Sequence, residues 1–215
     1  IPVTTVSNTA QPFEISLSSG HYYLATSGGV DFGSITQSSG LLSFVDTFVT
    51  SSAGSVAINN NYAYITNQLL SQTVTSCLIN PDGSLGSMLT PCGTAYTFPV
   101  RINSIAIYNK YAYVTTGIST VGYPSGGVFY CSVSAGTLTG CTETGDAAAF
   151  SRPSSIAAYN GYVYFSNSTN GYIGSCQIDT SGTITDGSLI AGNCNAQAGS
   201  NAGAAFSGPG QISIY

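Results

Sequence analysis

The chain contains the same thirteen-residue pattern three times, and this repetition constrains the fold more than any other feature of the sequence. The copies span residues 55–67, 104–116 and 155–167. Each copy starts with Ser, continues with a short apolar run and ends in a Tyr-x-Tyr segment, and the corresponding tyrosines are 49 and 51 residues apart. A period of this length is typical of stacked supersecondary units rather than of one irregular domain.

A weaker fourth copy comes first in the chain, at residues 14–26, with His21 in place of the first tyrosine. In every copy the apolar run predicts a buried strand, and the alternating Tyr-x-Tyr segment predicts a second strand after a tight turn. Asn160-Gly161 is the clearest of these turns and is a strong hairpin signal. Two further strand signals follow in each unit, and no stretch has capped helical periodicity.

Units of 40 to 50 residues with four antiparallel strands are typical of β-propeller blades. We therefore predict an all-β fold, a β-propeller of about four four-stranded antiparallel blades in a single domain, 1–215. An additional strand without a blade of its own is expected at each end of the chain. The predicted repeat units are 13–53, 54–101, 102–153 and 154–209, and the two orphan strands are 3–6 and 211–215.

The second strands carry a family resemblance. Tyr64-Ile-Thr-Asn67, Tyr113-Val-Thr-Thr116 and Tyr164-Phe-Ser-Asn167 resemble the Tyr-Val-Thr-Asn repeat of the YVTN-family propellers. That family occurs in surface-layer and other extracellular proteins and is related to lactonase-like propellers. The resemblance implies a propeller fold over nearly the whole chain, and it implies little about activity.

The six cysteines follow the repeat. Cys77, Cys131 and Cys176 occupy the same place on the third strand of their units, and Cys92, Cys141 and Cys194 lie on or just after the fourth. Of the 15 pairings that six cysteines allow, this phase selects 77–92, 131–141 and 176–194, each within one blade. Disulfides imply an oxidising compartment, so we expect an extracellular or cell-surface protein.

Charge is scarce, and this excludes several functions. Three basic and eight acidic residues make up 5% of the chain and give a net charge of −5, whereas an ordinary domain is about 25% charged. Three basic residues cannot neutralise a nucleic-acid backbone or anchor the protein to an anionic membrane. No apolar run is long enough for a transmembrane helix. We expect no nucleic-acid partner and no membrane insertion.

Catalytic machinery is also scarce. His21 is the only histidine, and no nucleophile elbow accompanies it. Turn chemistry accounts for acids such as Asp82, Asp179 and Asp186. Lactonase-like propellers use acidic metal ligands near the central channel, and Glu14 is the only acid in a first strand, so the family's activity does not carry over. The cysteine spacing does not fit a zinc site. We predict no catalytic residue, no metal and no cofactor.

Two surface features suggest glycan chemistry. Repeated tyrosines among Asn, Ser and Thr could stack on sugar rings, although the same tyrosines could instead pack between and over the blades. Asn167-Ser168-Thr169 is the one N-glycosylation sequon. The candidate sugar-stacking residues are Tyr62, Tyr64, Tyr111, Tyr113, Tyr162 and Tyr164.

The last strand offers a route to self-association. Gln211, Ile212, Ser213, Ile214 and Tyr215 copy the beginning of a repeat and stop before its turn. Either the chain is a fragment of a longer repeat protein, or a terminal strand completes a sheet in another molecule. Our leading hypothesis is a non-enzymatic structural or adhesive module that assembles into filaments or a surface layer through these strands. A secreted sugar-binding lectin and a lactonase-like hydrolase are the alternatives.

Overall fold

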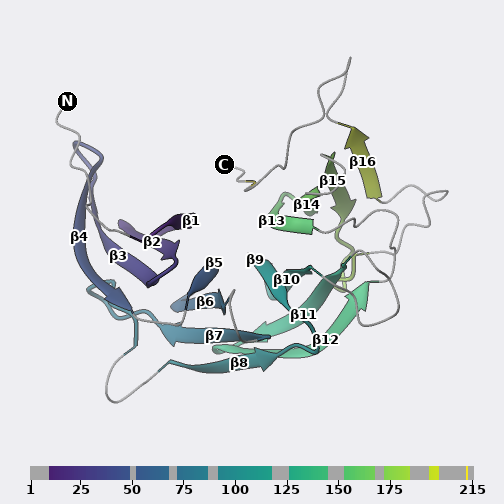
Figure 1. The fold of residues 1–215 in the computed structure, drawn as a ribbon, viewed down its shortest axis with the longest axis horizontal. Coiled ribbons are helices and arrows are strands. Elements are labelled where there is room, and N and C mark those ends of the chain that lie inside the picture. Colours follow the sequence, from purple (N-terminus) through teal and green to yellow (C-terminus); the bar gives the residue numbers. More distant parts are fainter. Residues whose placement is uncertain are drawn as a thin grey trace. The chain divides into compact units, whose positions relative to one another are not determined.

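A computed structural model of the protein describes residues 10–48, 52–67, 72–86, 92–117, 126–144, 153–167, 172–184, 194–198 and 212. These residues form four antiparallel sheets of four strands each (Figure 1). The described residues contain no helix, so none is present there that could cross a membrane. The predicted all-β propeller of four four-stranded blades is confirmed.

The strands follow the repeat along the chain. Sheet 1 contains β1 (Pro12–Ser18), β2 (His21–Thr26), β3 (Gly29–Thr36) and β4 (Leu41–Phe48). Sheet 2 contains β5 (Ala53–Asn59), β6 (Tyr62–Asn67), β7 (Thr73–Leu78) and β8 (Gly93–Thr97). Sheet 3 contains β9 (Ile102–Tyr108), β10 (Tyr111–Thr116), β11 (Val128–Ser134) and β12 (Thr137–Thr144). Sheet 4 contains β13 (Pro153–Tyr159), β14 (Tyr162–Asn167), β15 (Tyr172–Gln177) and β16 (Cys194–Ala198).

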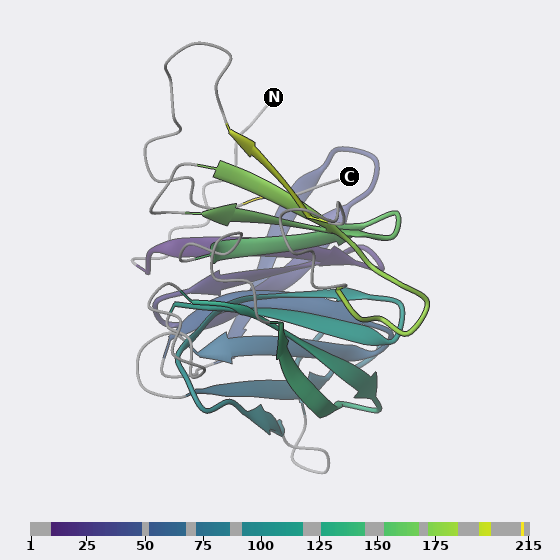
Figure 2. The ribbon, with the colours of Figure 1, turned by 90° about the vertical axis from the view of Figure 1, so that its right-hand side faces the viewer.

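Within each sheet the strands lie in chain order, so every neighbouring pair is a simple antiparallel connection. Figure 2 shows this for sheet 4, where the yellow-green β16 lies at one edge. The first two strands of each sheet join through a two-residue hairpin. Asn60, Asn109 and Asn160 have φ values of 52°, 56° and 49° in these turns, the left-handed conformation that such hairpins require and that Asn tolerates.

The chain divides into two compact units, Ile1–Thr97 and Phe98–Tyr215. Unit 1 holds sheets 1 and 2, and unit 2 holds sheets 3 and 4. The single domain over 1–215 stays a prediction. The predicted strand 3–6 lies outside the described residues, as does all of 211–215 except Ile212.

In unit 1 the core lies between the two sheets. One face of sheet 1, with Tyr23 and Phe32, packs against one face of sheet 2, with Val56, Ile65 and Cys77. We call the face of a sheet that packs on the next sheet along the chain its following face, and the opposite face its preceding face. Here the following face of sheet 1 packs against the preceding face of sheet 2. All five side chains are at least nine-tenths buried, so burial of apolar area is what holds the two sheets together.

Unit 2 repeats this arrangement. Tyr113 and Val128 on the following face of sheet 3 pack against Ile156, Phe165 and Cys176 on the preceding face of sheet 4. Hydrogen bonds also join the sheets, because the backbone N–H of Ile156 donates to Oγ of Ser104 at 3.4 Å. The same repeat positions therefore make the sheet-to-sheet contact in both units.

Candidate functional site

A cleft of about 360 Å³ opens in unit 1, where the hairpins of sheets 1 and 2 approach the segment that follows β7. Ser18 and Ser19 contribute from the β1–β2 hairpin, and Asn60 and Asn61 from the β5–β6 hairpin. The other lining residues are His21, Tyr23, Leu78, Ile79, Asn80 and Pro81.

Turn chemistry places the two hairpins at the cleft. Ser18 pairs with His21 and Asn59 with Tyr62, so each connection has only two residues. Ser19 takes a φ of 49° and Asn60 a φ of 52°. These short, twisted turns hold hydroxyl and amide side chains at the ends of the strands.

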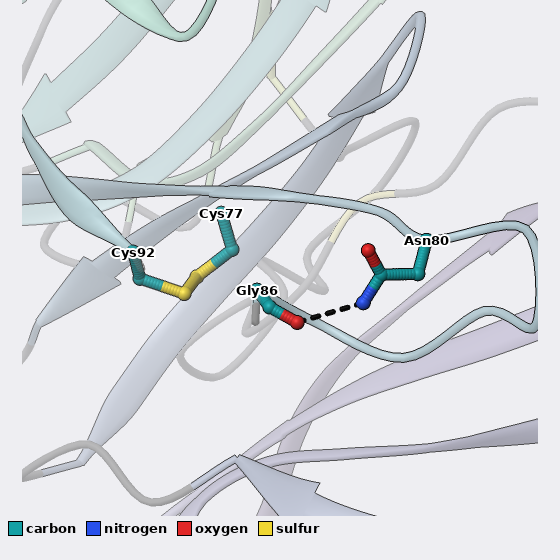
Figure 3. The surroundings of a disulfide bond; sticks show 4 residues. All are labelled: Cys77, Asn80, Gly86 and Cys92. Carbon is teal, nitrogen blue, oxygen red and sulfur yellow. Dashed lines mark hydrogen bonds between the residues drawn. A yellow bond between two sulfur atoms is a disulfide. The ribbon is translucent and has the colours of Figure 1, made fainter. Parts of the chain in front are cut away.

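The segment after β7 is held by Asn80. Its side-chain amide donates to Oγ of Ser84 at 2.8 Å. The same amide donates to the carbonyl oxygen of Gly86 at 2.7 Å (Figure 3). Its backbone N–H donates to the carbonyl oxygen of Ser84 at 2.9 Å, and Ile79 pairs with Leu85 in an isolated bridge. Residues 79–86 therefore form a fixed arm rather than a loose loop.

Gly83, at the tip of this arm, is where sheet 1 meets sheet 2. The hydroxyl of Tyr23 donates to the carbonyl oxygen of Gly83 at 3.0 Å. A Cβ atom on Gly83 would lie 2.3 Å from the His21 ring, and the residue has a φ of +86°. Only glycine meets both conditions. Burial, with a smaller contribution from Asp82, raises the pKa of Tyr23 to about 12, so its hydroxyl stays a donor at neutral pH.

Asp82 follows Pro81 in the arm and places a negative charge next to the cleft, although it is not one of the lining residues. Its Oδ1 accepts from the backbone N–H and hydroxyl of Ser84 at 3.0 and 2.6 Å. These hydrogen bonds, and more weakly the neighbouring His21, hold the pKa of the Asp82 carboxyl below its usual value. None of the described residues that line the cleft carries a carboxylate, a lysine or an arginine.

Unit 2 contains the same contact at the equivalent repeat positions. The hydroxyl of Tyr113 donates to the carbonyl oxygen of Gly182 at 2.9 Å, and a Cβ on Gly182 would lie 2.3 Å from the Tyr111 ring. Burial first, and then nearby groups including Tyr111 and Asp179, raise the pKa of Tyr113. We call each Tyr–Gly contact a latch. The sequence did not indicate either glycine as the partner of a tyrosine in the previous sheet.

Asp82 and Asp179 hold the turns that follow β7 and β15, whereas Glu14, Asp31, Asp46 and Glu143 lie in strands. Asp186 lies outside the described residues. Oδ1 of Asp179 accepts from Ser181 and Thr183, in the same way that Asp82 accepts from Ser84. Asp31 is fully buried in β3, where its Oδ1 accepts from the Thr47 hydroxyl at 2.6 Å. Within the described ranges, no group of three or more His, Cys, Asp or Glu side chains could hold a metal ion.

Two of the three predicted disulfides lie wholly within the described part of the chain. Cys77 is joined to Cys92 (Figure 3) and Cys131 to Cys141, with Cα atoms 4.2 and 4.1 Å apart. Cys176 is also disulfide-bonded, and its backbone partner in the β15–β16 pairing is Cys194. Cys77 and Cys176 lie in the cores between sheets, so the bonds reinforce buried contacts and not only the outer strands.

The tyrosine pairs separate by position. Tyr64 and Tyr113 are buried, so neither ring offers a face to a sugar. Tyr62 and Tyr111 are half-buried, Tyr162 is partly exposed, and its neighbour Tyr164 lies 6.3 Å away, ring centre to ring centre. The two tyrosines of a pair are two residues apart, so they lie on the same face of their strand, and the first of them lies next to the hairpin at the end of the strand.

The glycosylation candidate is poorly placed. Asn167 is the last residue of β14 and is buried, so the folded chain leaves no room for a glycan on this amide. Ile212, in the candidate assembly strand, donates its backbone N–H to Oγ of Ser155 at 3.2 Å. This matches the bond from Ile156 to Ser104, so Ile212 lies where the first strand of a further blade begins.

No family model matches the sequence, and no curated protein matches it either. Solved structures do match. A functionally unknown protein from Desulfotomaculum acetoxidans aligns with a TM-score of 0.60 and 16% identity, over 83% of this chain and 56% of its own. A putative 6-phosphogluconolactonase from Bacteroides fragilis aligns with a TM-score of 0.58 and 16% identity, over 82% and 53%.

A computationally designed protein, Ika4, aligns with a TM-score of 0.54 and 13% identity, over 82% of this chain and 97% of its own. The chain thus spans about half the length of the two natural proteins and nearly all of the designed one. At these identities the similarity supports the propeller fold alone. The YVTN family membership remains a resemblance, whereas the propeller fold that it implied is present.

Proposed function

We propose that the protein is a secreted, non-enzymatic propeller module that works through contacts and associates with other copies of itself. The observation that carries this proposal is a pair of apolar side chains on sheet 1, of which one, Ile15, is exposed although its repeat equivalents are buried. Two disulfides and a propeller fold fit a secreted module. The scarcity of charge also favours association, because little electrostatic repulsion separates the copies.

The exposed apolar residues lie on the preceding face of sheet 1. Ile15 in β1 occupies the repeat position of Val56, Ile105 and Ile156, which are 0%, 1% and 2% exposed, yet Ile15 is 40% exposed. Leu17 on the same strand face is 56% exposed. An apolar pair of this kind on an otherwise standard blade indicates a contact surface.

Strand register extends this surface across the sheet. Leu17 lies opposite Tyr22, Tyr22 opposite Gly33, and Gly33 opposite Phe44, so these residues share one face. Phe44 is exposed and Tyr22 is buried. The exposed apolar area therefore lies on the first and last strands of sheet 1.

The repeat itself specifies the partner. Within both units, a preceding face of this composition is covered by the following face of another blade. We therefore infer that the C-terminal blade of a second copy, with its strand 211–215, covers sheet 1. Such a head-to-tail contact uses two different surfaces, so it propagates into a filament or closes into a ring.

A pair of charge-matched variants tests the proposal. Leu17→Asp places a charge in the contact, and Val45→Asp places the same charge on an equally exposed residue, also 56%, in β4. Light scattering after size exclusion and negative-stain imaging should show assemblies for the wild type and Val45→Asp. Leu17→Asp, and a chain lacking residues 210–215, should be monomeric with an unchanged melting temperature.

Two results would refute self-association: a monomeric wild type at every concentration tested, or assembly of Leu17→Asp to the same extent as Val45→Asp. The enzymatic alternative rests on the fold shared with the putative lactonase. It predicts hydrolysis of a sugar lactone by the purified protein, with and without added calcium. The lectin alternative rests on the cleft of unit 1.

A further inference from the structure

We propose that the cleft of unit 1 binds a small uncharged carbohydrate. This site differs from the tyrosine pairs that suggested sugar binding in the sequence, and it does not depend on self-association. Its volume, about 360 Å³, is at the lower end of the range for small-molecule pockets.

The chemistry of the lining matches hydroxyl groups. Asn60 and Asn61 each present an amide that both donates and accepts, and Ser18 and Ser19 present hydroxyls that do the same. None of these four side chains forms a hydrogen bond with another described residue. Their hydrogen-bonding capacity is therefore available to a ligand, and mixed donors and acceptors suit sugar hydroxyls, which also do both.

The lining also contains apolar residues. Leu78, Ile79 and Pro81 contribute to it, together with the half-buried His21. A sugar ring has C–H groups on its faces and hydroxyls at its edge, so a lining that combines apolar and polar side chains complements it. The apolar residues supply area burial, and the polar residues supply orientation.

Charge argues against an anionic ligand. Asp82, next to Pro81, keeps its carboxylate ionised because hydrogen bonds from Ser84 lower its pKa. The lining contains no lysine or arginine, and the whole chain has a net charge of −5. A phosphorylated or acidic sugar would enter against this field, whereas a neutral one would not.

The cleft is also preorganised. The Asn80 bonds fix the arm, and the Tyr23 latch fixes the arm to sheet 1. Ile79 donates its backbone N–H to the carbonyl oxygen of Asn61 at 2.7 Å, which ties the arm to the second hairpin. A ligand would therefore lose little of its binding free energy to ordering the protein.

Saturation-transfer NMR of the full chain with free glucose, galactose, mannose and N-acetylglucosamine tests the proposal, with glucose 6-phosphate and N-acetylneuraminic acid as anionic probes. At least one neutral sugar should give a saturable signal, and the anionic probes should give none. The double variant Asn60→Gly, Asn61→Ala should weaken that binding at least tenfold. Glycine keeps the left-handed φ of 52° without strain.

Asn160→Gly is the matched control, because Asn160 occupies the same turn position in sheet 4 with a φ of 49°. It should leave sugar binding unchanged. Ser18→Ala alters neither turn and should give a smaller loss of sugar binding. It serves as the test variant if the double variant unfolds. Sizing of the same variants should match the wild type, which separates this site from self-association. Absence of binding by every neutral sugar, binding of only the anionic probes, or undiminished binding by both cleft variants would overturn the proposal.

Discussion

The two units join their sheets by the same latch but surround it with different side chains. In unit 1 the Tyr23 hydroxyl donates to the carbonyl oxygen of Gly83, which lies against the His21 ring. In unit 2 the Tyr113 hydroxyl donates to that of Gly182, which lies against the Tyr111 ring. Both acceptors are backbone atoms, so the sequence around the latch can change without loss of the bond. The comparison separates what the fold needs, a tyrosine and a glycine, from what each unit adds.

Unit 2 has a segment equivalent to the arm after β15, and the two segments differ in where the carboxylate lies. Gly83 and Gly182 occupy equivalent places, since their N–H groups donate to Asn80 and Asp179 respectively. Asp82 lies directly before its glycine, whereas Asp179 lies three residues before. In both segments the carboxylate holds the turn. His21 also contributes to lowering the pKa of Asp82, whereas no histidine acts on Asp179.

The largest effect should come from the latch glycines. Gly83→Ala and Gly182→Ala force a Cβ into an aromatic ring at a φ of +86° and +81°. Each should lower the free energy of unfolding by about 2 kcal/mol or more. Hydrogen exchange measured by mass spectrometry should show the loss mainly within the unit that carries the substitution.

The matched controls are Gly20→Ala in unit 1 and Gly161→Ala in unit 2. These glycines have φ values of +80° and +78°, but a Cβ there would meet nothing within 4 Å. They report the backbone strain alone, so the difference from the latch glycines measures the ring contact. Equal losses at Gly83 and Gly20 would show that the His21 contact contributes nothing.

A smaller effect should follow removal of the latch hydroxyl. Tyr23→Phe and Tyr113→Phe each lose one buried hydrogen bond and leave a buried carbonyl, which costs about 1 kcal/mol. Tyr22→Phe is the control next to Tyr23, because the Tyr22 hydroxyl is buried without a hydrogen-bond partner among the described residues. Urea denaturation should rank Tyr22→Phe as the most stable of the three variants. Destabilisation by Tyr22→Phe equal to that by Tyr23→Phe would contradict the assignment.

The smallest effect should come from acid. Hydrogen bonds, first from Ser84 and Ser181, lower the pKa values of Asp82 and Asp179 in the folded state. A lowered pKa stabilises the fold above the usual carboxyl pKa, about 4, and this contribution is lost as the pH falls through the folded value. Asp82→Asn and Asp179→Asn should each reduce the drop in melting temperature between pH 6 and pH 3. Asp46→Asn in β4 is the charge-matched control and should change that drop less.

The repeat made the fold predictable, because strand alternation and turn residues are local signals. The third strand of sheet 4 illustrates the limit of such signals. The sequence from Tyr172 to Ile178 is apolar at both ends, but the strand ends at Gln177, since Ile178 leaves the sheet to form an isolated bridge with Ile184. The same exit occurs after β7, at Ile79. Apolar periodicity does not distinguish a ladder residue from a bridge residue.

The cleft and the latches could not be predicted in this way. Tyr23 and Gly83 are 60 residues apart, and Tyr113 and Gly182 are 69 apart, so their contact depends on how one sheet packs on the next. The paired spacing of the cysteines was informative because a disulfide needs two visible partners. A tyrosine that bonds to a backbone carbonyl has only one visible partner in the sequence.

The disulfide bonds are unevenly distributed among the sheets, and this has a mechanical consequence. Cys77, Cys131 and Cys176 each lie opposite the residue between the two tyrosines of the neighbouring strand. In sheet 1 the equivalent residue of the second strand is Tyr22, and Gly33 lies opposite it. Gly33 therefore occupies the cysteine position in sheet 1. The bonds 77–92 and 131–141 enclose sequence separations of 15 and 10 residues. Under a pulling force those loops withhold about 50 and 35 Å of contour length, at roughly 3.3–3.6 Å per residue. Sheet 1 contains no cysteine, so it can extend over its full contour length under the same force.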